Sequence, residues 1–180
     1  MAKLTAEQMK NIDSYNKDIT HIEGTINAVR ARPGMYVGAL GKYSAITMFR
    51  EIFQNSIDQV LYDKSPCNAI SVLFDERDTK FIITDNGLGI PFNKFSVFTE
   101  GHTGKNLTEK KLYDYSAGLN GIGAKATNAL SEYFDVKSYR YDGTCKHVLF
   151  KKGVLKKEEI IKNPEKLQGT RTEFTPDHSI

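Results

Sequence analysis

Three polar side chains on one predicted helix are the first residues in this sequence that can do chemistry. Glu51, Asn55 and Asp58 are spaced four and three residues apart. Because a helix turns by about 100° per residue, the three side chains share one stripe of its surface. Exposed helix faces usually mix Lys with Glu, but this stripe holds only carboxylates and an amide, which can bind a metal ion and orient a water molecule. An ordinary solvated polar face is the alternative interpretation.

A second candidate site follows a predicted apolar strand. The strand Phe81-Ile82-Ile83 leads into the segment Asp85-Asn86-Gly87-Leu88-Gly89-Ile90-Pro91. Asp85, fixed at the strand end, can accept a hydrogen bond from an exocyclic amine such as that of adenine, and the glycines allow a flat ring to approach the backbone closely. Asn-Gly and Asp-Asn are also common in turns, so a plain turn is the alternative.

A glycine-rich segment before a predicted helix is suited to binding phosphate. It reads Gly118-Leu119-Asn120-Gly121-Ile122-Gly123-Ala124-Lys125-Ala126. Free N–H groups and the positive end of the helix dipole both attract an anion at such a place. The segment lacks the Gly-Lys-Ser/Thr of a Walker A loop and the third glycine of GxGxxG. Lys105 in a preceding loop can add a mobile cation. The alternatives are a flexible hinge without a ligand and a solvated lysine.

The helix that carries the polar stripe is the clearest element of the sequence. Apolar residues recur at three- and four-residue steps between Ser44 and Tyr62 and predict one buried face, formed by Ile46, Phe49, Phe53, Ile57 and Val60. This face lies nearly opposite the polar stripe. A shorter helix is predicted over residues 25–32, before Pro33-Gly34, and another over residues 123–131.

The remaining periodic segments predict strands, two of which form a hairpin around Asp142-Gly143. The predicted strands cover residues 69–75, 80–84, 133–141, 144–151, 154–161 and 170–175. This order of helices and strands predicts an α/β two-layer sandwich with a mixed, mostly antiparallel sheet. Residues 1–20 have no sustained period and are predicted to form an N-terminal arm.

Composition excludes several classes of protein. With 26% charged residues, 10 Phe, 9 Tyr and a formal net charge of +3, the chain is neither disordered nor strongly basic. Cys67 and Cys145 form no CxxC pair, which favours a reduced, cytoplasmic setting over a disulfide framework. The N-terminus lacks an apolar secretory segment, and the apolar runs are too short to span a bilayer, so we expect no membrane partner.

Taken in order, the motifs resemble one family, the GHKL ATPases. Those that carry the resemblance are Arg32-Pro33-Gly34-Met35-Tyr36-Val37-Gly38, Glu51-x-x-x-Asn55-x-x-Asp58, Asp85-x-Gly87-x-Gly89, Gly118-Leu119-Asn120-Gly121-x-Gly123 and Gly169-Thr170. Within that fold they are most similar to the N-terminal ATPase domain of type IIA DNA topoisomerases, the gyrase B and topoisomerase IV ParE group. The resemblance spans about residues 15–177 and implies a GHKL sandwich with helices on one face of the sheet.

The resemblance also implies ATP and Mg²⁺ as ligands and a role for each matching residue. Glu51 would be the general base that polarises the attacking water, and Asn55 would give a side-chain oxygen to Mg²⁺. Asp85 would bind the adenine amino group, with Thr170 assisting through a water. The other ATP-binding residues that it implies are Asp58, Gly87, Gly89, Ile90, Pro91, Lys105, Tyr113, Gly118, Leu119, Asn120, Gly121, Ile122 and Gly123.

The sequence departs from the bacterial pattern at the rim of the implied pocket. The bacterial enzymes usually have a Glu and an Arg that form a salt bridge where this chain has Gln59 and Leu88. We expect both ends of that bridge to be lost together, changing the rim and inhibitor contacts but not ATP binding. The Gly-Ile-Gly-Ala-Lys run after Asn120 is similar to eukaryotic and viral enzymes, which leaves the branch of the family open.

The resemblance implies a function for a larger enzyme. Residues 21–180 would form the ATPase domain, without the transducer and cleavage domains, and ATP hydrolysis would drive DNA strand passage. The implied partners are a second copy, bound through the N-terminal arm, a DNA-cleaving subunit like gyrase A or ParC, and double-stranded DNA. The alternative is a stand-alone nucleotide-binding regulatory module without significant turnover.

Overall fold

Six strands form one antiparallel sheet in the computed structural model, which describes residues 24–38, 40–99 and 122–179. The strands are β1 (Ile70–Asp75), β2 (Lys80–Asp85), β3 (Ser131–Arg140), β4 (Thr144–Lys151), β5 (Val154–Lys162) and β6 (Gly169–Pro176), in the order β1-β2-β6-β3-β4-β5. The prediction of a two-layer sandwich with a mostly antiparallel sheet is confirmed, and the sheet is not mixed among the described residues, because every strand pair is antiparallel. The predicted hairpin at Asp142-Gly143 is confirmed between β3 and β4.

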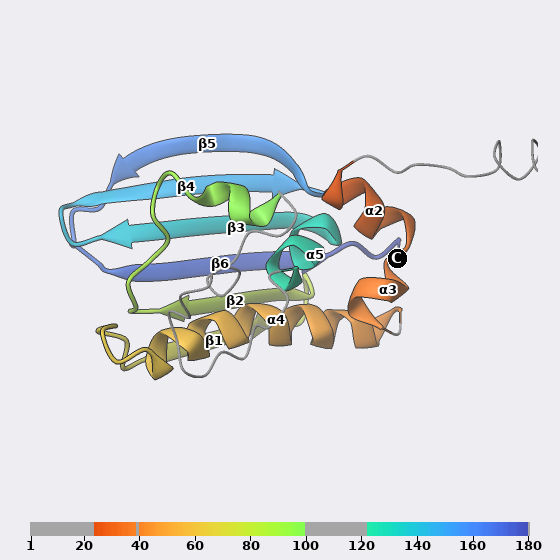
Figure 1. The fold of residues 1–180 in the computed structure, drawn as a ribbon, viewed down its shortest axis with the longest axis horizontal. Helices are drawn as coiled ribbons and strands as arrows, with labels where there is room; N and C mark the ends of the chain where they lie inside the picture. The colour runs from red at the N-terminus through yellow and green to blue at the C-terminus, as the bar shows by residue number, and fades with distance from the viewer. Residues whose placement is uncertain (1–23, 39, 100–121, 180) are drawn as a thin grey trace, which may run out of the picture.

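The helices lie over one face of this sheet (Figure 1). They are α2 (Thr25–Ala31), α3 (Gly34–Val37), α4 (Lys42–Leu61), the 3₁₀ helix η1 (Phe95–Phe98) and α5 (Gly123–Ala129). The sequence did not predict α3 or η1, which are four residues each and too short to show a period. The helix predicted over residues 123–131 ends earlier, because Ser131 already belongs to β3.

The core lies between the sheet and its helices. Successive side chains of a strand point to opposite faces, so Phe134 and Val136 of β3 and Phe174 of β6 face the helices, where they are fully or almost fully buried. The ring of Phe174 stacks on that of Phe81 with centroids 5.1 Å apart. The ring centroid of Phe49 on α4 lies 5.6 Å from that of Phe81, so the long helix packs against β2 through these two rings.

The prediction of the buried face of α4 is correct only in part. Met48, Ile52 and Ser56 are buried, whereas Ile46 and Val60 are 60% and 46% exposed. Periodicity locates an apolar face, but the neighbouring elements decide which part of it is covered. Because α4 packs against α5 as well as β2, its buried side is rotated away from Ile46 and Val60.

A cluster of three charged residues, Arg30, Lys152 and Asp177, joins the end of β6 to α2 and α5. Arg30 of α2 donates one hydrogen bond to the carbonyl oxygen of Ala129, at 2.7 Å, and a second to Oδ2 of Asp177, at 2.9 Å. Lys152, in the turn between β4 and β5, lies 3.0 Å from the same oxygen. Burial alone would raise the pKa of Asp177, but hydrogen bonds from Ser179, Lys152 and Arg30 hold it well below its usual range.

Among the described helices, none is both long and apolar enough to cross a membrane.

The hydrogen bonds and ion pairs of Asp177 in this charged cluster predict a contribution to stability that is lost in acid. Asp177→Asn should lower the free energy of unfolding by about 1–3 kcal/mol near neutral pH, because a buried carboxylate loses bonds to charged partners. The folded-state pKa is depressed, so this stabilisation is complete above the ordinary Asp pKa of about 4 and is lost as the pH falls below it. Urea denaturation of parent and variant should therefore give a difference that shrinks in acid. A difference that is constant down to about pH 3 contradicts the assignment, and Asp63→Asn, at an exposed position, is the control.

Candidate functional site

Asp85, the last residue of β2, is a buried and oriented carboxylate. It is 6% exposed. Its Oδ2 accepts a hydrogen bond from the hydroxyl of Ser56 on α4, at 2.8 Å, and its Oδ1 accepts one from the backbone N–H of Gly87, at 3.0 Å. Each oxygen of an ionised carboxylate carries two lone pairs and can accept more than one hydrogen bond. The bond to Gly87 is one that an Asx turn makes, while the burial of the side chain is not typical of a surface turn.

Strand β6 runs directly beside Asp85. The register pairs Asp85 with Thr170, and directly opposite residues of an antiparallel pair project from the same face. Gly169 has φ of +123°, and a Cβ there would lie 2.0 Å from the carbonyl oxygen of Asp85. Only glycine allows the two strands to approach this closely, so the sequence pair Gly169-Thr170 places the Thr170 side chain next to the carboxylate.

The loop after Asp85 is held by neutral side chains. The backbone N–H of Leu88 donates to Oε1 of Gln59, at 3.1 Å. The two positions expected to have lost a salt bridge therefore remain in contact through a hydrogen bond between side chain and backbone. A Cβ on Gly87 would lie 2.9 Å from Gln59, which shows how closely α4 packs against this loop.

The carboxylate of Glu51 lies against the start of α5. A Cβ on Gly123 would lie 1.8 Å from Oε2 of Glu51, so a side chain there would displace the carboxylate from this position. The contact brings the end of the glycine-rich segment to the polar stripe of α4. Along that stripe Glu51 is half-buried, Asn55 is exposed and Asp58 is buried. A fully solvated polar face is therefore excluded for Asp58, and the stripe lies at the border between protein and solvent.

Other predicted site residues are divided between the described and the undescribed parts of the chain. Ile90 and Ile122 pack against the core cluster, whereas Pro91 is exposed. Six predicted residues lie outside the described residues, and their roles stay predictions: Lys105, Tyr113, Gly118, Leu119, Asn120 and Gly121.

Three residues near the site were not among the predicted ones. Lys125 on α5 has no exposed surface, and burial lowers the pKa of its ammonium group. In the sequence, Lys125 was used to exclude a Walker A loop and was given no role in the site. Ser138 on β3 and Gln168, just before β6, bind the backbone of the loop after Asp85. Ser138 alternates with Phe134 and Val136 along the same strand, so it occupies a position that faces the core. A polar residue at such a position was the sequence signal that could have identified it.

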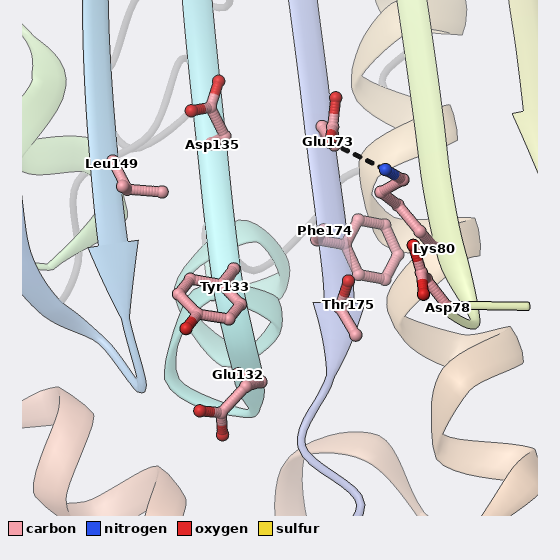
Figure 2. A pocket seen from close by; sticks show the side chains of 9 residues that line it. All are labelled: Asp78, Lys80, Glu132, Tyr133, Asp135, Leu149, Glu173, Phe174 and Thr175. Atoms are coloured by element: carbon pink, nitrogen blue, oxygen red, sulfur yellow. Dashed lines mark ion pairs between the residues drawn. The ribbon is translucent and has the colours of Figure 1, made fainter. Parts of the chain in front are cut away.

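The opposite face of the sheet carries a hollow that is separate from this site. Figure 2 shows that side chains from β2, β3, β4 and β6 line it, with Lys80 and Glu173 paired across its floor. The ion pair spans 3.5 Å. The alternation of side chains along each strand puts Tyr133, Asp135 and Glu173 on this face and Asp85 on the other. None of the predicted site residues lines the hollow.

Known proteins share both the sequence and the fold of this chain. The B-type subunit of DNA topoisomerase 4 from Staphylococcus aureus, in strains Mu50 and N315, is 34% identical over 181 aligned positions, which cover 96% of this chain and 26% of the relative. The chain thus spans about a quarter of the length of these curated relatives. The crystal structure of the 43K ATPase domain of Thermus thermophilus gyrase B in complex with an aminocoumarin matches with a TM-score of 0.69 and 28% identity, over 86% of this chain and 40% of that one. No model of a known protein family matches the chain.

These likenesses confirm the family resemblance and the fold. The chain has the fold of the GHKL ATPase domain of type IIA DNA topoisomerases, with a six-stranded antiparallel sheet and helices over one of its faces.

The close approach at Gly169 predicts a position that tolerates no side chain. Gly169→Ala should lower the free energy of unfolding by at least about 2 kcal/mol, because the new Cβ meets fixed backbone atoms and an alanine is strained at this φ. Gly34→Ala is the matched control, since a Cβ there meets nothing within 4 Å, and it should change stability by about 0.5 kcal/mol or less. Equal effects of the two substitutions in chemical denaturation would show that β6 does not press on Asp85.

Proposed function

We propose that this chain is the ATP-binding and ATP-hydrolysing domain of a type II DNA topoisomerase subunit, of the gyrase B and ParE kind. The observation that carries the proposal is the buried Asp85 carboxylate, oriented by Ser56 and Gly87 and placed beside Thr170. A carboxylate held in this way at a strand end is an acceptor for an amino group on a flat ring. The likeness to topoisomerase subunits along most of the chain supports the same assignment.

The base of ATP is proposed to bind between Asp85 and the glycines that follow it. Asp85 accepts a hydrogen bond from the adenine amino group, and Thr170 supports this contact from β6. Gly89 has φ of +73°, a conformation that favours glycine, and the ring is proposed to lie close to the backbone of this loop. Ile90, packed against the core cluster, gives the ring an apolar surface.

The phosphates are proposed to lie toward Glu51 and the glycine-rich segment. Lys105 and the N–H groups of residues 119–123 are proposed to hold the phosphates, and Tyr113 is proposed to contact the base. Glu51, held against Gly123, accepts a proton from the water that attacks the γ-phosphate. Phosphoryl transfer depends mostly on positioning and on stabilising charge, which such a set of groups supplies.

The residues present fit a magnesium ion at the phosphate end. Asn55 is exposed and lies one helical turn from Glu51, so its amide oxygen is available as a hard ligand. When bound, Mg²⁺ neutralises charge on the phosphate oxygens. Glu51 and Asn55 share the stripe of α4, so the base and the metal ligand are positioned by one element.

A larger assembly is part of the proposal and rests on the family resemblance. The full-length protein would dimerise through the N-terminal arm and act with a DNA-cleaving subunit, like gyrase A or ParC, on double-stranded DNA. ATP hydrolysis in this domain would drive strand passage in the cytoplasm.

Binding of the base is tested at Asp85. Asp85→Ala should weaken affinity for a non-hydrolysable ATP analogue with Mg²⁺ by at least about tenfold, because a hydrogen bond to a charged acceptor is lost and the adenine amine is left unpaired. Calorimetric titration measures this. Asp78→Ala, in the exposed turn at the other end of β2, should bind like the parent. If Asp85→Ala also binds like the parent, the adenine site lies elsewhere.

Chemistry is tested at Glu51. Glu51→Gln keeps the shape of the side chain but removes the base, so phosphate release should fall by roughly two to four orders of magnitude while analogue affinity stays nearly intact. Glu76→Gln, an exposed change of the same kind, is the control. Parental turnover by Glu51→Gln would show that the catalytic assignment is wrong. Tight binding without turnover in the parent itself would favour the stand-alone binding module.

A further inference from the structure

The backbone of the loop Gly87–Ile90 is fixed by side chains rather than by a helix or a strand. This loop follows β2 and lies outside the regular elements. The N–H groups of Gly87, Leu88 and Ile90 donate to Asp85, Gln59 and Ser138, respectively. The carbonyl oxygens of the same three residues accept from Gln168 and Ser138. Side chains from separate parts of the fold therefore hold the loop from several directions.

Ser138 makes the most specific of these contacts. It lies in β3, has no exposed surface and faces the helices with Phe134 and Val136. Its hydroxyl accepts from the N–H of Ile90, at 2.8 Å, and donates to the carbonyl oxygen of Ile90, at 3.0 Å. A buried hydroxyl at an apolar position is unfavourable unless it is hydrogen-bonded, and here the loop supplies both partners.

The neighbouring glycine shows how closely the loop lies on this hydroxyl. A Cβ on Gly89 would be 2.8 Å from Oγ of Ser138. The backbone of the loop therefore contacts Ser138 of β3 at this point. The serine side chain sets the distance between the loop and the sheet.

Gln168 holds the other half of the loop from the surface. Its Nε2 donates to the carbonyl oxygens of Leu88, at 2.8 Å, and Gly87, at 3.3 Å. Its Oε1 accepts from the backbone N–H of Tyr141, at 3.1 Å, in the turn between β3 and β4. The amide nitrogen and the amide oxygen of Gln168 therefore both form hydrogen bonds, which connect the loop to the β3–β4 hairpin.

We propose that Ser138 and Gln168 are positioning residues for the base of the bound nucleotide, an inference that rests on the proposed function. They touch neither the reacting phosphate nor the water. They act through the backbone of Gly87–Ile90, which the adenine ring approaches. They hold this backbone at the distance from Asp85 that the ring requires. Their loss therefore weakens nucleotide binding and base selectivity without slowing the chemical step.

The first test removes the buried hydroxyl of Ser138. Ser138→Ala should raise the Kd for a non-hydrolysable ATP analogue, and the KM for ATP, by about tenfold, because both bonds to Ile90 are lost. The kcat at saturating ATP should stay within about twofold, since Glu51 is untouched. The ratio of ATP-analogue to GTP-analogue affinity should fall toward one.

The matched control is Ser131→Ala. Ser131 lies on the same strand, is equally buried and donates one hydrogen bond to the carbonyl oxygen of Thr127, at 2.6 Å, far along the strand from the loop. It should lower the melting temperature comparably while leaving KM and base selectivity at parental values. A merely structural role for Ser138 would make the two variants behave alike.

A second variant keeps the inference testable even if Ser138→Ala does not fold. Gln168→Glu retains the oxygen that accepts from Tyr141 but replaces the donor to Gly87 and Leu88 with a second oxygen, which repels their carbonyls. It should raise the KM for ATP by at least about fivefold with kcat unchanged. Leu167→Glu, exposed and adjacent, controls for the added negative charge.

The outcomes separate this inference from the function on which it rests. A parent that binds the analogue and variants that bind it equally well overturn the positioning role alone. A parent that binds no analogue overturns the proposed function and this inference with it. Raised KM with constant kcat in both variants, and parental values in both controls, supports the positioning role.

Discussion

The burial of one carboxylate, Asp85, is the constraint on which the rest of the site depends. A charged group out of water is unfavourable unless hydrogen bonds replace its hydration. The Ser56 hydroxyl and the Gly87 N–H meet that requirement from two directions, one from α4 and one from the loop that follows the strand. Satisfying the carboxylate thus fixes the distances between the long helix, the end of β2 and the loop that follows it.

Glycines allow the other elements to close around this point. Gly169 lets β6 press on the backbone of Asp85, Gly89 lets the loop rest on Ser138, and Gly123 leaves room for the Glu51 carboxylate at the start of α5. In each case a Cβ would displace an atom of the site. Gly89 and Gly123, which were singled out in the sequence as ligand-binding residues, therefore also serve close packing between protein elements.

Sequence predicted the parts of this structure that rest on local patterns. The long helix, the six strands and the hairpin at Asp142-Gly143 followed from periodicity and turn chemistry, and Asp85 and Glu51 were singled out by residue type and position. Features set by distant neighbours were missed. Ile46 and Val60 were predicted to be buried because periodicity does not show where α5 lies. Gln168 gave no signal because the two loop carbonyls to which it donates are 81 and 80 residues away in the chain. Gln59 and Leu88, the positions at which the resemblance implies a salt bridge in bacterial enzymes, are joined here by a hydrogen bond between the Gln59 side chain and the Leu88 backbone.

The central claim is that the nucleotide binds on the helix-covered face of the sheet, at the end of β2. Mapping of backbone amide chemical shifts in the isotope-labelled chain, titrated with a non-hydrolysable ATP analogue and Mg²⁺, tests it most directly. We expect the largest shifts at Asp85, Gly87 and Gly169. Shifts confined to Tyr133 and Glu173 on the opposite face, or none at saturating analogue, would contradict it.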